Sequence, residues 1–225
     1  MSTRMTLILI VVMLLAAMVS GWLLWDRLPA QMASHWNAAD EVDGYLPRFW
    51  GVFLMPILTL VMAALFLVIP RIDPLRDNIA RFRGVFNWFI VIVIAFLLYV
   101  YALTLIYNLG IPFRMSRMML PAMGVLLYFA GELVRQARRN WFIGIRTPWT
   151  LSDERVWAET HRFGSLLFKA AGVLIFISAF LPGSAAWVVL GMVLLIAFVP
   201  LGYSYWLYER YRREACTPQG KEERE

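Results

Sequence analysis

Charged residues are scarce in this chain, and several long stretches have none. Asp, Glu, Lys and Arg together make up 16% of its 225 residues, whereas 61% of the residues are hydrophobic. Soluble domains contain roughly 45–50% apolar residues, so this composition excludes a soluble globular protein, which could not bury so much apolar surface. The chain has a single cysteine, Cys216, which excludes an internal disulfide.

Sequence patterns of the common catalytic sites are also absent. The two histidines do not belong to a paired histidine–glutamate zinc pattern. The chain has no nucleophile elbow, no phosphate-binding glycine loop and no pair of carboxylates within an apolar run. We therefore predict a protein that is not an enzyme, with no catalytic residues, no cofactor and no metal site.

Long hydrophobic runs are present instead. Twenty helical residues rise about 30 Å, the thickness of the bilayer hydrocarbon core. Uncharged runs of 20 or more residues are Thr6–Trp25, Trp50–Ile69, Val85–Tyr107 and Ala185–Trp206. Two weaker runs, Arg117–Val134 and Ser165–Leu181, keep their charges near the ends, where a charge reaches water at low cost. The prediction is an all-α integral membrane protein with six transmembrane helices.

The distribution of basic residues predicts the orientation of these helices. With a cytoplasmic N-terminus, sixteen Lys and Arg residues fall in inside segments and four in or next to outside segments. Cytoplasmic loops carry such an excess, so we expect a multi-pass plasma-membrane protein with both termini in the cytoplasm. The net charge of +6 then reflects orientation and contact with the lipid bilayer rather than direct nucleic-acid binding.

The order of the chain suggests two membrane units and a tail. Residues 1–84 form an N-terminal two-helix unit with an extracytoplasmic loop at 26–48. Residues 85–211 form a four-helix unit with a cytoplasmic loop at 135–164, and 212–225 are expected to be a disordered tail. The first span is interpreted as an uncleaved anchor, with a cleaved secretory signal as the alternative. A tight turn at 182–184 predicts that the last two spans are antiparallel neighbours.

Charged groups within the weaker spans have simple expected partners. Glu132 lies three residues before Arg135 in the sequence, so the two side chains are expected to pair at the inner surface. Lys169 is expected to extend toward the cytoplasmic water.

The cytoplasmic loop contains an unusual stretch between residues 140 and 157. It carries three tryptophans and a Gly-x-Arg-Thr-Pro turn. Thr150 or Ser152 is expected to cap a helix, since Thr150 and Asp153 fit the capping-box spacing. A short amphipathic helix is then expected at the membrane surface, before the fifth span. The simpler alternative is that these tryptophans are interface anchors and that Arg146 meets lipid phosphate.

This stretch, continued to Phe163, closely resembles the signature of the SdpI family of bacterial and archaeal membrane proteins. The best-known member protects a cell from its own secreted killing peptide and holds a transcriptional repressor at the membrane. The resemblance implies a partner-binding motif with these members: Asn140, Gly144, Arg146, Thr147, Pro148, Trp149, Ser152, Asp153, Trp157 and His161.

The extracytoplasmic loop resembles an N-terminal domain of unknown function that often accompanies this family. Its matching positions are Pro29, His35, Trp36, Asn37, Asp43 and Gly44. Ala33 and Asp40 depart from the pattern, which has proline and glycine at these positions. We expect Trp36 and Tyr45 to pack on the membrane surface and Asp43-Gly44 to form a turn. The alternative is that His35 and nearby carboxylates bind a metal, but their spacing is a weak signature.

The function that the resemblance implies is immunity to a secreted membrane-active peptide. The expected partners are the lipid bilayer, a peptide toxin outside, and a transcriptional repressor or other cytoplasmic protein inside. The alternative is a small-solute transporter or envelope-homeostasis protein on the same scaffold. A purely sensory membrane anchor is a third hypothesis.

Overall fold

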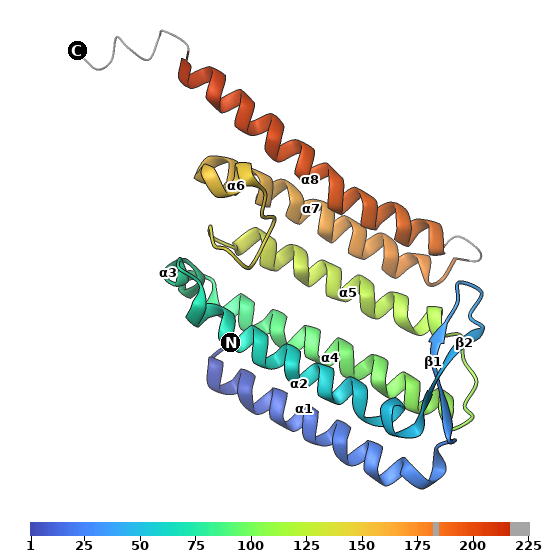
Figure 1. The fold of residues 1–225 in the computed structure, drawn as a ribbon. Helices are drawn as coiled ribbons and strands as arrows, with labels where there is room; N and C mark the ends of the chain where they lie inside the picture. The colour runs from blue at the N-terminus through green and yellow to red at the C-terminus, as the bar shows by residue number, and fades with distance from the viewer. Residues whose placement is uncertain (182–184, 217–225) are drawn as a thin grey trace.

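Six long helices run side by side along the molecule (Figure 1). The computed structural model describes residues 1–181 and 185–216. The long helices are α1 (Thr3–Leu24), α2 (Arg48–Ile72), α4 (Arg83–Asn108), α5 (Met115–Gln136), α7 (Glu154–Ser178) and α8 (Ala185–Cys216). Each is long and apolar enough to cross a bilayer, so the predicted six spans are confirmed by length and composition.

Shorter elements lie at the two ends of the helix array. They are η1 (Trp25–Arg27), β1 (Gln31–Trp36), β2 (Val42–Pro47), α3 (Arg76–Arg81) and α6 (Pro148–Ser152). The strands form an antiparallel hairpin at one end, which we call the hairpin end. Helices α3 and α6 lie at the opposite end, together with residues 137–147 (Figure 1), and we call it the loop end.

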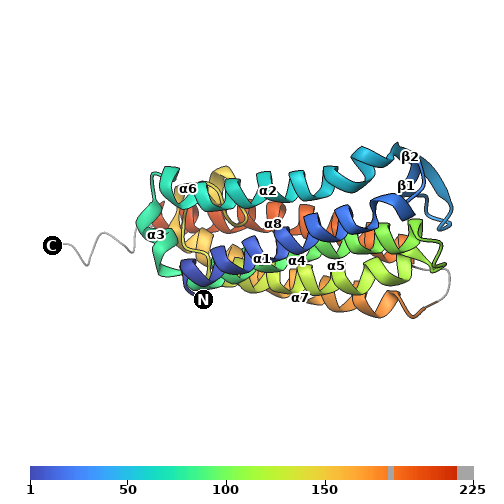
Figure 2. The same cartoon turned by 90° about the horizontal axis from the view of Figure 1, so that it is seen from below.

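The helices follow one another in a regular order across the molecule. Helices α1, α2 and α4 pack against one another, α5 packs on α4, α7 on α5, and α8 on α7 (Figures 1 and 2). The Met1 amino group donates a hydrogen bond to the Gly84 carbonyl, at 3.4 Å. The N-terminus therefore lies at the loop end, as does the last turn of α8. The division into units at residue 84 stays a prediction.

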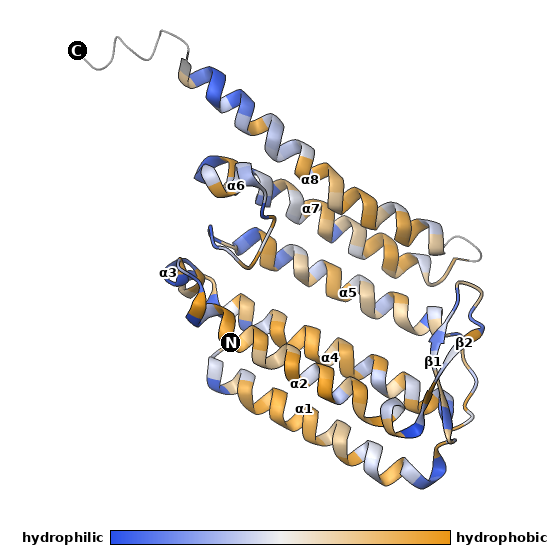
Figure 3. Cartoon of the chain, viewed as in Figure 1, coloured by the Kyte–Doolittle hydropathy of each residue, from blue (hydrophilic) through white to orange (hydrophobic). Residues whose placement is uncertain are grey.

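Apolar residues cover the middle of the helices, and polar residues gather at both ends (Figure 3). Between 6% and 39% of each span's most apolar window is buried within the protein. Trp187, 75% exposed, and Phe198, 63% exposed, belong to this outer apolar surface on α8. Such faces are stable against lipid and would be costly in water, so the chain is a multi-pass protein of the cell membrane.

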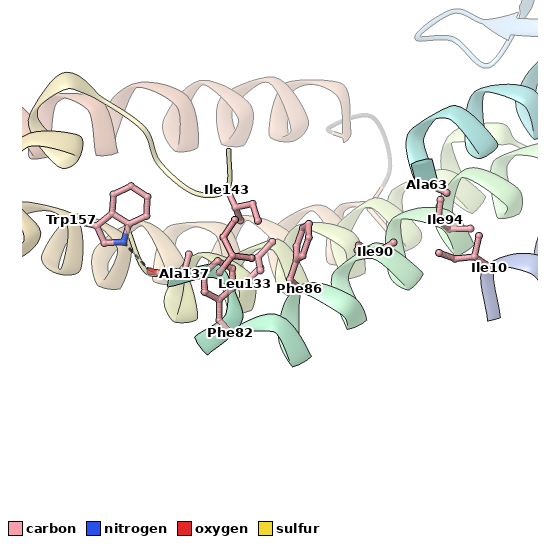
Figure 4. Close-up of a cluster of buried hydrophobic side chains, with 11 residues drawn as sticks. Ile10, Ala63, Phe82, Phe86, Ile90, Ile94, Leu133, Ala137, Ile143 and Trp157 are labelled. Atoms are coloured by element: carbon pink, nitrogen blue, oxygen red, sulfur yellow. Dashed lines mark hydrogen bonds between the residues drawn. The ribbon is translucent and has the colours of Figure 1, made fainter. Parts of the chain in front are cut away.

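A cluster of buried apolar side chains joins the first helices to the loop end (Figure 4). Ile90 and Phe86 of α4 lie in its centre, and both are almost fully buried. Leu133 of α5 and Trp157 of α7 extend the cluster toward the loop end, and Ile143 joins it from the loop between them. The position of residues 137–147 is therefore coupled to the packing of α4 and α5.

Helices α5 and α7 pack against each other through small residues. A Cβ atom built on Gly172 would lie 2.5 Å from the Gly124 carbonyl oxygen, and one built on Gly131 would lie 2.9 Å from the Ser165 carbonyl oxygen. Only hydrogen fits at these glycines, so the two backbones approach closely. In membranes, such small-residue contacts drive helix association by packing rather than by the hydrophobic effect.

The hairpin makes the all-α prediction wrong for residues 31–47. The predicted turn at Asp43-Gly44 is also wrong, because both residues lie in β2 and Gly44 pairs with His35 of β1. The actual turn spans Asn37 to Asp40, where the Asp40 amide donates to the Asn37 carbonyl at 3.0 Å. Strand pairing satisfies backbone groups that a chain at the membrane surface would otherwise leave exposed.

Two other predictions for the second half of the chain need correction. The expected surface helix before the fifth span is the first part of α7, which is continuous from Glu154 to Ser178 because no residue breaks it. Helix α8 continues to Cys216, so residues 212–216 are helical rather than part of a disordered tail. The predicted turn at 182–184 and the rest of the predicted tail, 217–225, lie outside the described residues.

Candidate functional site

Residues 140–161, the signature segment, fold around two aromatic side chains of α7. Trp157 is buried and donates a hydrogen bond from Nε1 to the Ala137 carbonyl, at 2.9 Å (Figure 4). The His161 ring stacks on Trp157, with 3.9 Å between ring centroids. His161 Nδ1 lies 2.8 Å from the Trp157 carbonyl, and Nε2 accepts the Ile145 amide at 3.0 Å. Both ring nitrogens are therefore used, which assigns the proton to Nδ1.

Gly144 allows the loop to pass close to this histidine. Its φ is +113°, a conformation that residues with a side chain rarely adopt. A Cβ atom here would overlap His161 Nε2, and Trp157 Cζ2 would lie only 3.4 Å away. The position therefore excludes a side chain for two separate reasons, one conformational and one steric.

Asn140 closes the loop upon itself. Its side chain is fully buried, and its Oδ1 accepts hydrogen bonds from the amides of Phe142 and Ile143, at 2.9 and 2.6 Å. Its Nδ2 donates to the carbonyls of Arg138 and Ile143, at 2.7 and 2.8 Å. The amide thus satisfies backbone groups of a partly buried turn that belongs to no helix or strand.

Two residues outside the predicted site hold this loop against the first half of the chain. Asp73, 2% exposed, accepts the Trp141 amide through Oδ2 at 2.9 Å and the Leu75 amide through Oδ1 at 2.6 Å. Asn78 of α3 donates to the Arg139 carbonyl at 2.8 Å. Sequence reasoning missed both, although Asp73 is an acidic residue within a strongly basic loop.

Helix α6, which is part of the signature segment, contacts α8. Thr147 is its N-cap and exchanges hydrogen bonds with Thr150 in a capping box, with Pro148 at the first helical turn. The Thr147 hydroxyl also lies 3.1 Å from the hydroxyl of Ser204 on α8. Trp149 packs on Tyr205 of α8, with ring centroids 5.0 Å apart.

The predicted helix caps in this segment are wrong. Thr150 or Ser152 was expected to cap a helix, but Thr150 lies inside α6 and the Ser152 hydroxyl donates to the Trp149 carbonyl at 3.0 Å. The chain becomes extended at Asp153, which caps α7 instead by accepting the amides of Arg155 and Val156, at 2.7 and 3.3 Å. The break between α6 and α7 separates the two expected capping partners.

The loop of the signature segment before α6 exposes two large aromatic side chains. Trp141 is 52% exposed and Phe142 is 38% exposed. Beside them, exposed Arg146 donates to the Trp141 carbonyl at 2.7 Å. The loop before α6 therefore has a buried framework and presents two aromatic side chains and one guanidinium group side by side at the surface.

The second motif builds the hairpin end. Asn37 Oδ1 accepts the amides of Ala39 and Glu41, at 2.9 and 3.0 Å, and so shapes the turn between the strands. Asp40 has a φ of +64°, which aspartate tolerates better than most residues. The turn therefore keeps the left-handed conformation that glycine would provide. Asp40 also accepts the amide and hydroxyl of Ser116, at 2.8 and 2.6 Å, in the first turn of α5.

Other predicted residues of this motif support the hairpin. The Pro29 carbonyl accepts Arg48 Nε at 3.3 Å, and a Cβ atom on Gly44 would lie 2.8 Å from His35 Cβ. Trp36 packs edge-on against Tyr107 of α4, with ring centroids 5.1 Å apart. Tyr45, in contrast, is 60% exposed.

His35 has one carboxylate partner. His35 Nδ1 and Asp43 Oδ1 are 2.5 Å apart. Within residues 1–181 and 185–216, no group of three or more His, Cys, Asp or Glu side chains is arranged to hold a metal ion.

An ion pair between α5 and α7 differs from the sequence prediction. Glu132 Oε2 lies 2.5 Å from Lys169 Nζ, and the side chains are 33% and 19% exposed. The predicted partner, Arg135, is wrong because the close approach of α5 and α7 brings Lys169 nearer. Lys169 consequently does not extend to the cytoplasmic water, and it also lies over the Tyr128 ring.

Comparisons with known proteins bear on both motifs. Residues 136–204 match the model of the SdpI/YfhL protein family. The chain carries an SdpI-family region. Residues 11–60, a range that includes the hairpin, match a domain of unknown function, DUF1648. The resemblance predicted from the two motifs is therefore confirmed.

A curated relative extends the SdpI-family similarity to most of the chain. The chain is 24% identical over 193 residues to "Immunity protein SdpI" of Bacillus subtilis (strain 168). The match covers 85% of this chain and 90% of that protein. No solved structure matches the chain. The SdpI-family region contains the whole signature segment, α7 and most of the apolar part of α8.

Proposed function

We propose that this SdpI-family membrane protein gives its cell immunity to a secreted, membrane-active peptide. The observation that carries the proposal is the similarity to an immunity protein over 85% of the chain and 90% of that relative. The two family-model matches include the hairpin, within residues 11–60, and the signature segment, within residues 136–204. The similarity to an immunity protein also supports a role other than catalysis.

The orientation of the chain follows from its charge distribution. The basic loops, the N-terminus and the last turn of α8 gather at the loop end, whereas the hairpin end has few basic residues. Under the positive-inside rule, the loop end faces the cytoplasm and the hairpin end faces outside. Labelling of single introduced cysteines in intact cells tests this, because a residue in the hairpin would react with an impermeant reagent and Phe142→Cys would not.

A cavity at the hairpin end has the chemistry to hold part of an amphipathic peptide. It measures about 770 Å³ and lies between the hairpin turn and helices α5, α7 and α8. Asp40, Arg114 and Arg117 contribute charged groups, and Leu120 and Val189 contribute apolar surface. A peptide with alternating polar and apolar side chains would contact both kinds of surface.

The exposed face of the signature segment is the proposed contact for a cytoplasmic regulator. Trp141, Phe142 and Arg146 have the composition of small protein-binding sites, which are enriched in aromatic residues and arginine. A regulator bound here would contact a loop that is anchored to α3, α7 and α8. A relay of toxin binding through these contacts is part of the proposal.

Expression in a sensitive host, followed by challenge with secreted killing peptides, tests the function. We expect the intact chain to protect, and Arg114→Ala with Arg117→Ala to reduce protection at an unchanged membrane level. Arg27→Ala is the control, because it removes a charge at the same end but does not line the cavity. Accumulation of a small solute without any protection would instead favour a transporter.

Capture of a cytoplasmic protein tests the relay separately. We expect a regulator to co-purify with the intact protein and to be lost with Trp141→Ala and Arg146→Ala. Arg162→Ala is the matched control, since Arg162 is an exposed cation on α7 outside the proposed contact. Equal capture by all variants would contradict the relay and leave immunity to be judged by the protection assay.

A further inference from the structure

A second cavity, at the loop end, has four arginines in its lining. It measures about 440 Å³ and lies between α3, the end of α5 and the start of α7. Trp157 and His161, which hold the signature segment, also line it. Its guanidinium groups belong to Arg81, Arg135, Arg138 and Arg139.

The positive charge of this cavity is largely uncompensated. Its lining includes four arginines and one carboxylate, Glu154, so the formal excess is three positive charges. Glu154 Oε1 lies 3.6 Å from Arg139, and in the described part of the chain no ion pair involves the other three arginines. Glu132, the acidic residue nearest in sequence to Arg135, forms its ion pair with Lys169 and has only a weaker, longer-range electrostatic interaction with Arg135.

One donor among these groups has no acceptor. Arg139 Nε is buried and makes no hydrogen bond, although the same side chain donates from NH1 to the Leu151 carbonyl at 3.4 Å. A buried donor without a partner is costly, so an acceptor at this position would stabilise the protein. Guanidinium groups recognise oxyanions well because their planar N–H donors match carboxylate and phosphate oxygens.

The arrangement favours a phosphate group over a carboxylate. The arginines come from two separate elements, α3 and the segment at the end of α5, and therefore approach the cavity from different sides. A phosphate group offers several oxygens in tetrahedral directions, whereas a carboxylate offers two in one plane. Membrane orientation alone needs basic residues somewhere at this end, as Arg71 and Arg76 provide, but it does not need them around one cavity.

We propose that this cavity binds a phosphate-bearing anion, either the headgroup of an anionic lipid or a soluble phosphate compound. Because Trp157 and His161 line the same cavity, an occupied site stabilises the signature segment. The ligand is thus bound on the opposite end of the molecule from the cavity proposed for a peptide toxin. Failure of the immunity proposal would leave this site unaffected.

The test uses the full chain in a nonionic detergent and in lipid nanodiscs. Thermal unfolding is followed with increasing inorganic phosphate, against chloride at equal ionic strength. In the lipid arm, nanodiscs of phosphatidylcholine are compared with nanodiscs that also contain phosphatidylglycerol. We expect a concentration-dependent rise in Tm in at least one arm, because a ligand that binds only the folded state stabilises it.

Charge-matched variants make the test specific. Arg81→Gln with Arg138→Gln removes two cavity arginines that are exposed and make no ion pair in the described chain. We expect apparent affinity to fall by about tenfold or more, which corresponds to about 1.4 kcal/mol. Arg71→Gln with Arg76→Gln removes the same charge outside the cavity and should weaken binding by less than about twofold, since salt screens distant charges.

The outcomes separate the ligand sources and can overturn the proposal. A response to phosphate alone identifies a soluble ligand, and a response to phosphatidylglycerol alone identifies a lipid; both support the site. No response in either arm, or equal weakening by the two double variants, overturns it. If the cavity double variant does not fold, Arg138→Lys replaces it, because it keeps the charge but loses the planar fork and should still weaken binding.

Discussion

Replacement of Gly144 by alanine should strongly destabilise the loop end. The φ of +113° at this position would strain a residue with a side chain by about 1–3 kcal/mol. The added Cβ would also displace His161 Nε2 from the partly buried Ile145 amide, and leaving this donor without an acceptor costs about 1–3 kcal/mol more. The expected total loss of unfolding free energy is about 2–6 kcal/mol.

Gly110 provides a matched control for backbone strain. Its φ is +86°, and a Cβ atom there would meet nothing within 4 Å. Gly110→Ala should therefore cost only the strain, about 1–3 kcal/mol. The difference between the two alanine variants measures the clash with the histidine.

Unfolding can be measured in detergent by tryptophan fluorescence or by loss of a monodisperse chromatographic peak. In a His161→Ala background, the steric part of the Gly144→Ala effect should disappear, which gives a coupling of about 1–3 kcal/mol. The reasoning is refuted if Gly144→Ala is no worse than Gly110→Ala, or if the histidine substitution leaves its cost unchanged.

Three further predictions concern the helix contacts and the loop. Gly172→Leu should separate α7 from α5 and lower the free energy of unfolding by about 1–3 kcal/mol. Gly191→Leu is the control and should be nearly neutral, because a Cβ atom at Gly191 meets nothing within 4 Å. Equal thermal stability of the two variants would contradict the packing of α5 on α7. Glu132→Gln should leave the partly buried Lys169 without its ion pair and lower the free energy of unfolding by about 1.5–3 kcal/mol, and adding Lys169→Met should restore most of it in the same unfolding assay. Asp73→Ala should release residues 140–147 from the end of α2 and lower the free energy of unfolding by about 1–3 kcal/mol. Hydrogen exchange of the backbone amides at residues 140–147 should become faster. Unchanged exchange would contradict a stabilising contact between Asp73 and Trp141.

The spans were predictable because a single property decides them. An uncharged run long enough to cross the hydrocarbon core has no stable alternative to a helix in lipid, so hydropathy located the four strong spans. The weak fourth and fifth spans were predicted because their charges lie near the ends, and the charge bias of the loops supported the fourth. The resemblance of residues 140–163 to a family signature also identified the right segment, which the family model confirms. It did not reveal which side chains are buried and which are exposed.

The parts that could not be predicted depend on contacts between distant residues. Asp73 contacts Trp141 across 68 positions, and Asp40 contacts Ser116 across 76. Local patterns do not contain such pairs. The helix caps were predicted wrongly for a related reason, because the position of Thr147 depends on its contact with Ser204 of α8 as well as on its own turn. The hairpin was missed because its strands have an irregular register and no regular alternation of apolar residues.

Helix α5 is fastened at each end to a different motif. Asp40 of the hairpin holds its first turn through Ser116, and the Ala137 carbonyl just after its last turn accepts Trp157. With 22 residues, this helix is a strut about 33 Å long. A helix that is hydrogen-bonded at both ends can carry a displacement of one end along its axis to the other end without any side chain in between changing its contacts. The hairpin tip can shift independently of this rod only by giving up both hydrogen bonds to Ser116.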